Sequence, residues 1–221
     1  MIPVKICGIT SLKNASMAVN FGASALGMIF YRGSLRYVEP YKTGKWISQI
    51  SGQVKKVGVF VNEEIEVIQS IVKRLSLDYV QLHGDESPEF CAKINKPIIK
   101  VIRVDNYVDN SLLKEYNVNA FLMDTYKEGL PGGTGEKFNW NFISSLKTET
   151  PIILSGGLNA ENIIEGIDRI HPAAVDLSSG VESSPGKKDQ NKMKQLFNVL
   201  KDTNVHTNLF NKSILRKHNG V

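Results

Sequence analysis

Short apolar runs rich in Val and Ile recur along the chain, and each is followed by a turn signal and a more polar stretch. Their starts lie roughly 20–30 residues apart, which is the length of one strand and one helix together. Strands buried on both faces read as continuous apolar runs, and such strands are typical of a parallel sheet covered by helices. The predicted strands are Val4–Ile6, Ala25–Phe30, Lys56–Val61, Tyr79–Leu82, Ile98–Val104, Ala120–Met123, Pro151–Leu154 and Ala174–Leu177.

Between these runs, apolar residues recur at the three- and four-residue spacing of one helix face. Leu12, Ala15 and Val19 predict a helix over 11–21, with Thr10 or Ser11 as its N-cap. The same spacing predicts helices over 63–75 and 160–170. A last helix is marked by Met193, Leu196, Phe197 and Leu200. The stretches between the fourth, fifth and sixth strands have the weakest helical pattern.

Eight strand–helix units in about 200 residues predict an α/β protein with the (β/α)8 architecture of a TIM barrel. A doubly wound open sheet is the alternative, but the units follow one another without a clear reversal of order. We expect one catalytic domain over 1–203 and a polar, basic, flexible tail over 204–221.

Composition excludes several classes of protein. Hydrophobic residues make up 42% of the 221 residues and charged residues 22%, as in globular proteins. No apolar run is long enough to span a membrane, and the first residues lack the layout of a signal peptide. The two cysteines, Cys7 and Cys91, show no zinc-ligand spacing and are expected to be reduced thiols. We therefore expect a cytoplasmic protein without a membrane partner or a metal.

The formal net charge of +5 raises the question of a nucleic-acid partner. Residues 201–221 account for +3 of it, and residues 1–200 for only +2. The tail contains a single aromatic residue, Phe210, and no patterned basic stripe. The charge therefore does not predict nucleic-acid binding.

Polar, ionisable or glycine residues follow every predicted strand. In a TIM barrel the carboxyl ends of the strands form the active-site rim, so these residues are the candidates for chemistry. In chain order they are Cys7, Arg36, Asn62, His83-Gly84, Arg103 with Asp105, Asp124, Ser155-Gly156-Gly157 and Ser178-Ser179-Gly180.

The loops after the last two strands favour a phosphate site, because that is where many barrels bind phosphate through backbone amides. Gly156 and Gly157 allow close approach of the backbone, and Ser179 and Gly180 offer a hydroxyl and further amides. The alternative is two glycine turns without a ligand. The segment Gly180–Lys187 resembles a P-loop but has the wrong spacing.

Cys7 and Asp124 are the acid–base candidates. A thiolate at Cys7 could act as base or nucleophile, and Lys5 lies on the same face of the strand. A small buried hydrophobic residue is the alternative interpretation of Cys7. Asp124 ends an apolar run, where desolvation would raise its pKa and suit it to general-acid work; otherwise it is a cap or turn residue.

Arg36 and His83 are candidates for ligand contacts. An arginine can bind a carboxylate or phosphate through two parallel hydrogen bonds, although a loop arginine is often only solvated. His83 suits either a ligand contact or a structural hydrogen bond. The glycine-rich segment Gly132–Gly135 after the sixth strand suits a mobile loop over the site.

The ordered set of motifs over roughly 4–200 resembles the phosphoribosylanthranilate isomerase family of tryptophan biosynthesis. No single motif is specific, but their order is. The matching segments are Lys5-Ile6-Cys7-Gly8-Ile9-Thr10, Gly27–Phe30, Ser34-Leu35-Arg36-Tyr37-Val38, Val57–Asn62, Val80–Asp85, Asp124-Thr125, Gly132–Gly135, Phe138, Trp140, Leu154–Leu158, Val175–Glu182 and Pro185–Asp189.

The resemblance implies a barrel enzyme without cofactor or metal, acting on N-(5-phosphoribosyl)anthranilate, a small phosphorylated molecule. It implies that Asp124 protonates the furanose ring oxygen and that Cys7 removes the proton from ribose C2. It further implies that Arg36 holds the anthranilate carboxylate. We expect His83 to contact the substrate as well. The phosphate would lie on Gly156, Gly157, Ser179 and Gly180. Other pathway enzymes are possible partners.

The chain departs from the family at Leu35, where proline is common and would stiffen the loop before Arg36. The neighbouring indole-glycerol-phosphate synthase is the alternative enzyme class. That synthase relies on lysine and glutamate at its strand ends, so the combination of Cys7 and Asp124 favours the isomerase.

Overall fold

Eight parallel strands close into a barrel in chain order, with β8 paired to β1. The computed structural model describes residues 1–50, 52–104, 110–124, 140–144, 146–201, 203 and 209–210. The strands are β1 (Val4–Cys7), β2 (Ala25–Ile29), β3 (Lys55–Phe60), β4 (Tyr79–Leu82), β5 (Ile98–Arg103), β6 (Ala120–Asp124), β7 (Ile152–Ser155) and β8 (Ala174–Leu177). The predicted TIM barrel is confirmed, and the open sheet is excluded.

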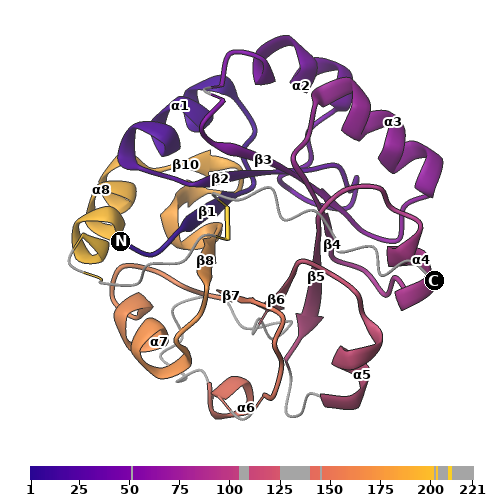
Figure 1. Ribbon diagram of the computed structural model, residues 1–221. Coiled ribbons are helices and arrows are strands. Elements are labelled where there is room, and N and C mark those ends of the chain that lie inside the picture. Colours follow the sequence, from indigo (N-terminus) through magenta and orange to yellow (C-terminus); the bar gives the residue numbers. More distant parts are fainter. Residues whose placement is uncertain are drawn as a thin grey trace.

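Helices follow the strands and surround the barrel (Figure 1). They are α1 (Leu12–Phe21), α2 (Pro40–Ile47), α3 (Ile65–Leu75), α4 (Pro88–Ala92), α5 (Asn110–Glu115), α6 (Asn141–Ser144), α7 (Ile163–Ile170) and α8 (Gln190–Leu200). The loop between β8 and α8 contains the 3₁₀ turn η1 (Ser179–Val181) and a small hairpin of β9 (Glu182–Ser184) and β10 (Lys187–Lys188).

The predicted helix over 11–21 forms as α1, and its N-cap is Ser11 rather than Thr10. The Ser11 hydroxyl accepts a hydrogen bond from the Asn14 amide at 3.3 Å, as N-cap side chains do. The weak helical pattern between the fourth and sixth strands corresponds to short helices. For example, α4 has five residues between its Ser87 cap and Lys93.

Alternate residues of each strand face two different cores. On β6, Ala120 and Leu122 belong to a cluster inside the barrel, whereas Phe121 and Met123 pack with the outer cluster that includes the helices. This two-sided burial explains why the strands read as continuous apolar runs. It also fixes which strand residues face inward, and hence which side chains can reach the barrel's ends.

Two tail residues are buried: Leu209 is 4% exposed and Phe210 is 2% exposed. Both pack against the barrel interior. The flexible tail over 204–221 stays a prediction. Residues 204–208 and 211–221 lie outside the described part of the chain. Among the described residues, no helix has the length and apolar character needed to cross a membrane.

Candidate active site

Cys7 and Lys5 share the space left by a glycine on the neighbouring strand. Both side chains are buried, and Cys7 on β1 is the register partner of Gly27 on β2. A Cβ at Gly27 would lie 2.8 Å from the Cys7 Sγ and 3.1 Å from the Lys5 Nζ. Gly27 is therefore required for the thiol and the ammonium group to occupy this part of the barrel together.

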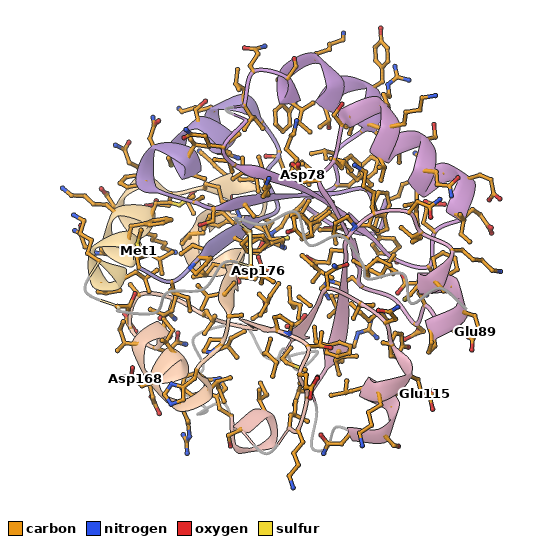
Figure 2. The ribbon with its side chains drawn as sticks, viewed as in Figure 1. Met1, Asp78, Glu89, Glu115, Asp168 and Asp176 are labelled. Carbon is orange, nitrogen blue, oxygen red and sulfur yellow. The ribbon has the colours of Figure 1, made fainter. Side chains whose placement is uncertain are left out.

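Lys5 forms a buried ion pair with Asp176 on β8, with Nζ 2.8 Å from Oδ1. Figure 2 shows Asp176 near the centre of the barrel, whereas Glu89, Glu115 and Asp168 lie at its outside. Burial alone lowers the pKa of Lys5, but Asp176 and Cys7 outweigh burial and raise the pKa above its usual value. The barrel interior therefore holds a fixed positive charge beside the thiol.

Burial raises the pKa of the Cys7 thiol. The positive charges of Lys5 and Lys188 oppose this rise, and the negative charge of Asp176 adds to it. The sequence suggested that Lys5 would favour the thiolate. Lys5 does act in that direction, but desolvation has the larger effect, so the pKa of Cys7 lies above its usual value.

The Arg36 guanidinium is fixed by Glu182, which sequence reasoning had not assigned to the site. Arg36 Nη2 donates to Oε2 at 2.7 Å, and Nε donates to the same carboxylate at 3.0 Å. Leu35 beside it is 80% exposed. The position of Arg36 thus depends on an ion pair from the loop after β8, and not on a proline in its own loop.

Gly8 provides the surface on which the Arg36 side chain lies. Its φ angle is +73°, and a Cβ there would lie 2.5 Å from Arg36 Cδ. Only glycine meets both conditions without strain. The motif residue that directly follows Cys7 therefore positions the arginine.

Glu182 also pairs with Lys188, a second residue that the sequence did not mark. Lys188 Nζ donates to Glu182 Oε1 at 2.7 Å, to the Ser178 carbonyl at 3.2 Å and to the Cys7 carbonyl. Burial raises the pKa of Glu182, but hydrogen bonds from Arg36 and the charge of Lys188 outweigh burial, so the pKa lies below its usual value. Burial lowers the pKa of Lys188.

Asp124, at the end of β6, lies beside His83, which follows β4. His83 Nε2 is 3.3 Å from Asp124 Oδ2, and His83 Nδ1 is 3.3 Å from the Gln81 side-chain nitrogen. A Gln81 N–H donated to Nδ1 leaves the ring proton of neutral His83 on Nε2, facing Asp124. Both His83 and Asp124 remain partly exposed at the rim.

A buried carboxylate organises the loop that carries His83. Glu86 accepts hydrogen bonds from the Asn62 and Gly84 amides, and Lys100 Nζ lies 3.0 Å from its Oε2. Lys100 also donates to the Gly84 carbonyl at 2.7 Å. These contacts join the loops after β3 and β4 and fix the backbone next to His83.

The two candidate phosphate loops are in direct contact. A Cβ at Gly180 would collide with the Leu158 carbonyl oxygen, so the turn η1 packs directly on the loop after β7. Gly156 and Gly157 have φ angles of +92° and +64°, which glycine adopts without strain. Gly180 thus lies directly against Leu158, the residue that follows Gly157.

The described part of the chain contains no cluster of three or more His, Cys, Asp or Glu side chains that could hold a metal. Gly132–Gly135 and Asp105 lie outside the described residues. Because all eight strands are parallel, the described residues at their carboxyl ends lie on one face of the barrel. That face carries a thiol, a carboxyl, a guanidinium and a glycine-rich pair of loops, a set suited to proton transfer on an anionic substrate.

Comparison with known proteins identifies the family of the chain. Residues 4–199 match the family model described as N-(5'phosphoribosyl)anthranilate (PRA) isomerase. The chain is 43% identical over 203 residues to the N-(5'-phosphoribosyl)anthranilate isomerase of Pelobacter propionicus, covering 92% of this chain and 97% of that protein.

Solved structures show the same fold. The phosphoribosyl anthranilate isomerase of Thermotoga maritima is 39% identical, with a TM-score of 0.81 over 92% of this chain and all of that one. A structure of such an isomerase in complex with reduced 1-(o-carboxyphenylamino)-1-deoxyribulose 5-phosphate is 36% identical, with a TM-score of 0.76 and the same coverage. The chain belongs to the phosphoribosylanthranilate isomerase family.

Proposed function

We propose that this protein catalyses the Amadori rearrangement of N-(5-phosphoribosyl)anthranilate to 1-(2-carboxyphenylamino)-1-deoxyribulose 5-phosphate in tryptophan biosynthesis. The main support is the 36% identity to the isomerase bound to a reduced form of that product, over 92% of this chain. The placement of a carboxyl, a thiol and two glycine-rich loops at one end of the barrel agrees with it.

Asp124 is the proposed general acid. In its protonated form it gives its proton to the furanose ring oxygen while the bond between that oxygen and C1 breaks, which leaves an iminium at C1. His83 contacts the same carboxyl at 3.3 Å and orients it toward the substrate. A positioned acid of this kind contributes typically 10²–10⁴-fold to a rate.

Cys7 is the proposed general base. Its thiolate removes the proton from C2, and the C2–H electron pair neutralises the iminium to give an enolamine. A proton then adds to C1 while the C2 hydroxyl loses its proton, which yields the ketone, so C1 is reduced and C2 oxidised without an external redox partner. The Lys5 ammonium stands beside the sulfur, where it stabilises the thiolate as it forms.

Arg36 and the glycine loops are the proposed anion sites. Glu182 occupies the Nε–Nη2 edge of Arg36, and we assign the Nη1 end to the anthranilate carboxylate. The phosphate is assigned to the amides of Gly156, Gly157, Ser179 and Gly180, helped by the start of η1. Two anion sites at opposite ends of the substrate would hold the sugar between acid and base.

Residues 1–203 are the proposed catalytic domain. Cys7 and Cys91 are both buried and neither forms a disulfide, which agrees with a reducing compartment, and we place the enzyme in the cytoplasm.

The test is the fluorescence decay of freshly made phosphoribosylanthranilate on adding the purified protein, followed by identification of the product. An accelerated decay with 1-(2-carboxyphenylamino)-1-deoxyribulose 5-phosphate as the sole product supports the isomerase. Decay at the spontaneous rate contradicts it.

A further inference from the structure

At the barrel end opposite the candidate site, most of the inward-facing side chains are small. Inward-facing residues at the start of the even-numbered strands include Ala25 on β2, Ala120 on β6 and Ala174 on β8. Tyr79, at the start of β4, supplies the one large side chain of this layer. Barrel interiors are normally filled by bulky branched residues, so three alanines leave space at this amino-terminal mouth.

Leu209 and Phe210 fill that space. Both belong to the same buried cluster as the three alanines and Tyr79. The Phe210 ring meets the Tyr79 ring edge to face, with centroids 5.7 Å apart, and the Tyr79 hydroxyl donates to the Leu209 carbonyl at 3.0 Å. Apolar packing, an aromatic pair and a buried hydrogen bond thus coincide on two tail residues.

We propose that the amino-terminal mouth of the barrel is a binding pocket for a Leu-Phe segment, and that this chain's own tail occupies it as an intramolecular plug. The tether makes the chain's own segment the favoured occupant. Thr203 is fixed by the Ile2 amide, which donates to its hydroxyl at 3.2 Å. Leu209 follows Thr203 by six residues, and a chain of that length reaches at most roughly 20 Å.

The plug is an addition to the family domain and is separate from the reaction. The family match ends at residue 199, ten residues before Leu209. Its ring contact and its hydrogen bond are with Tyr79, the first residue of β4, whereas the proposed catalytic groups Cys7 and Asp124 end their strands. In TIM barrels the amino-terminal face contributes to stability and the carboxyl-terminal face to activity. We therefore assign the plug to stability.

The test compares Leu209→Ala with Leu112→Ala in the full-length protein. The two variants make the same chemical change, but Leu112 is 42% exposed on α5. We expect Leu209→Ala, and Phe210→Ala likewise, to lower Tm by about 5–15 °C, and Leu112→Ala to lower it by no more than about 2 °C. The kcat/KM for phosphoribosylanthranilate at 25 °C should stay within about twofold of the parent.

A double-mutant cycle tests whether Tyr79 and the plug act together. Tyr79→Phe should lower Tm in the parent chain, because it leaves the buried Leu209 carbonyl without its donor, and should have little further effect in Phe210→Ala. An unchanged Tm in Leu209→Ala and Phe210→Ala overturns the proposal, as does a fully additive cycle. A fall in kcat/KM of the folded variants overturns the separation of plug and site. The proposal stands even if the protein fails the isomerase assay, because Tm reports the plug.

Discussion

The Arg36 guanidinium and the Glu182 carboxylate form a two-point ion pair between the loop after β2 and the hairpin after β8, with Nη2 2.7 Å from Oε2. Glu182 is almost fully buried and also holds Lys188. Arg36 is therefore oriented before any substrate arrives. A preorganised arginine loses less freedom on binding an anion than a solvated one does.

Replacing Glu182 by Gln should release Arg36 while keeping the size of the side chain. We expect the KM for phosphoribosylanthranilate to rise about tenfold, which corresponds to ~1.4 kcal/mol, with a smaller change in kcat. Glu165→Gln is the matched control, because Glu165 forms an exposed ion pair with Arg169 at 3.7 Å. Steady-state kinetics measure the KM of the two variants. An equal KM in both contradicts the role given to Glu182.

The lowered pKa of Glu182 predicts that its contribution to the stability of the fold is lost at acid pH. A carboxyl whose folded-state pKa is depressed stabilises the fold above its unfolded pKa of about 4.3, and this contribution is lost as pH falls through the folded-state pKa. The Tm difference between the parent and Glu182→Gln should therefore be largest near neutral pH and shrink below about pH 4. Thermal melts from pH 3 to pH 7 measure it. A difference independent of pH means that the ionised carboxylate is not the stabilising group.

Cys7→Ser and Asp124→Asn should each reduce kcat by at least about 10²-fold, as expected for the loss of a positioned base or acid. Both substitutions nearly preserve side-chain volume, so Tm should change little. In the parent protein the raised pKa of Cys7 predicts that kcat/KM still rises with pH above 7, since the thiolate fraction increases. Turnover near the parent level in either variant removes that residue from the mechanism.

Gly180→Ala should separate the two candidate phosphate loops, because the added methyl group meets the Leu158 carbonyl oxygen. We expect weaker inhibition by inorganic phosphate and a KM increase of about tenfold or more. Gly52→Ala serves as the control, since a Cβ there meets nothing within 4 Å. Unchanged inhibition by inorganic phosphate in Gly180→Ala would mean that the substrate phosphate does not bind at these two loops.

Lys5→Met should destabilise the protein by about 3–5 kcal/mol, because it leaves the Asp176 carboxylate buried without its partner. The double variant Lys5→Met with Asp176→Leu should regain most of that stability, since no unpaired charge remains. Denaturant unfolding compares the three chains. Iodoacetamide should also react more slowly with Cys7 in Lys5→Met, as the charge that favours the thiolate is gone.

The barrel could be predicted from the sequence because each strand is buried on both faces and each helix has an apolar stripe. Ala120–Met123 illustrates this, since its residues alternate between the inner and outer cores and are all apolar. The residues at the active-site rim could be predicted from the positions at which the strands end. Cys7, Arg36 and Asp124 could be named because their residue types stand out there.

Glu182, Lys188 and Gln81 could not be found in this way, because their roles arise from contacts across the barrel. Glu182 lies 146 residues from Arg36 in the chain, and nothing in the local pattern marks it as a partner. Lys188 directly follows a segment that has the wrong spacing for a P-loop, yet it donates to the carbonyl oxygens of Cys7 and Ser178. The Leu209-Phe210 plug was missed because a polar, basic tail contains too few apolar residues to predict docking.

The contact of Lys188 with Cys7 joins residues that are 181 positions apart. During synthesis the first seven strands can leave the ribosome and pair with their neighbours, but β1 has no partner on its other edge until β8 has emerged. Arg36 is synthesised early, but its side chain can be fixed only after Glu182 has been synthesised. A half-made chain therefore carries an open sheet edge for most of its synthesis, and its active site forms only when translation is almost complete.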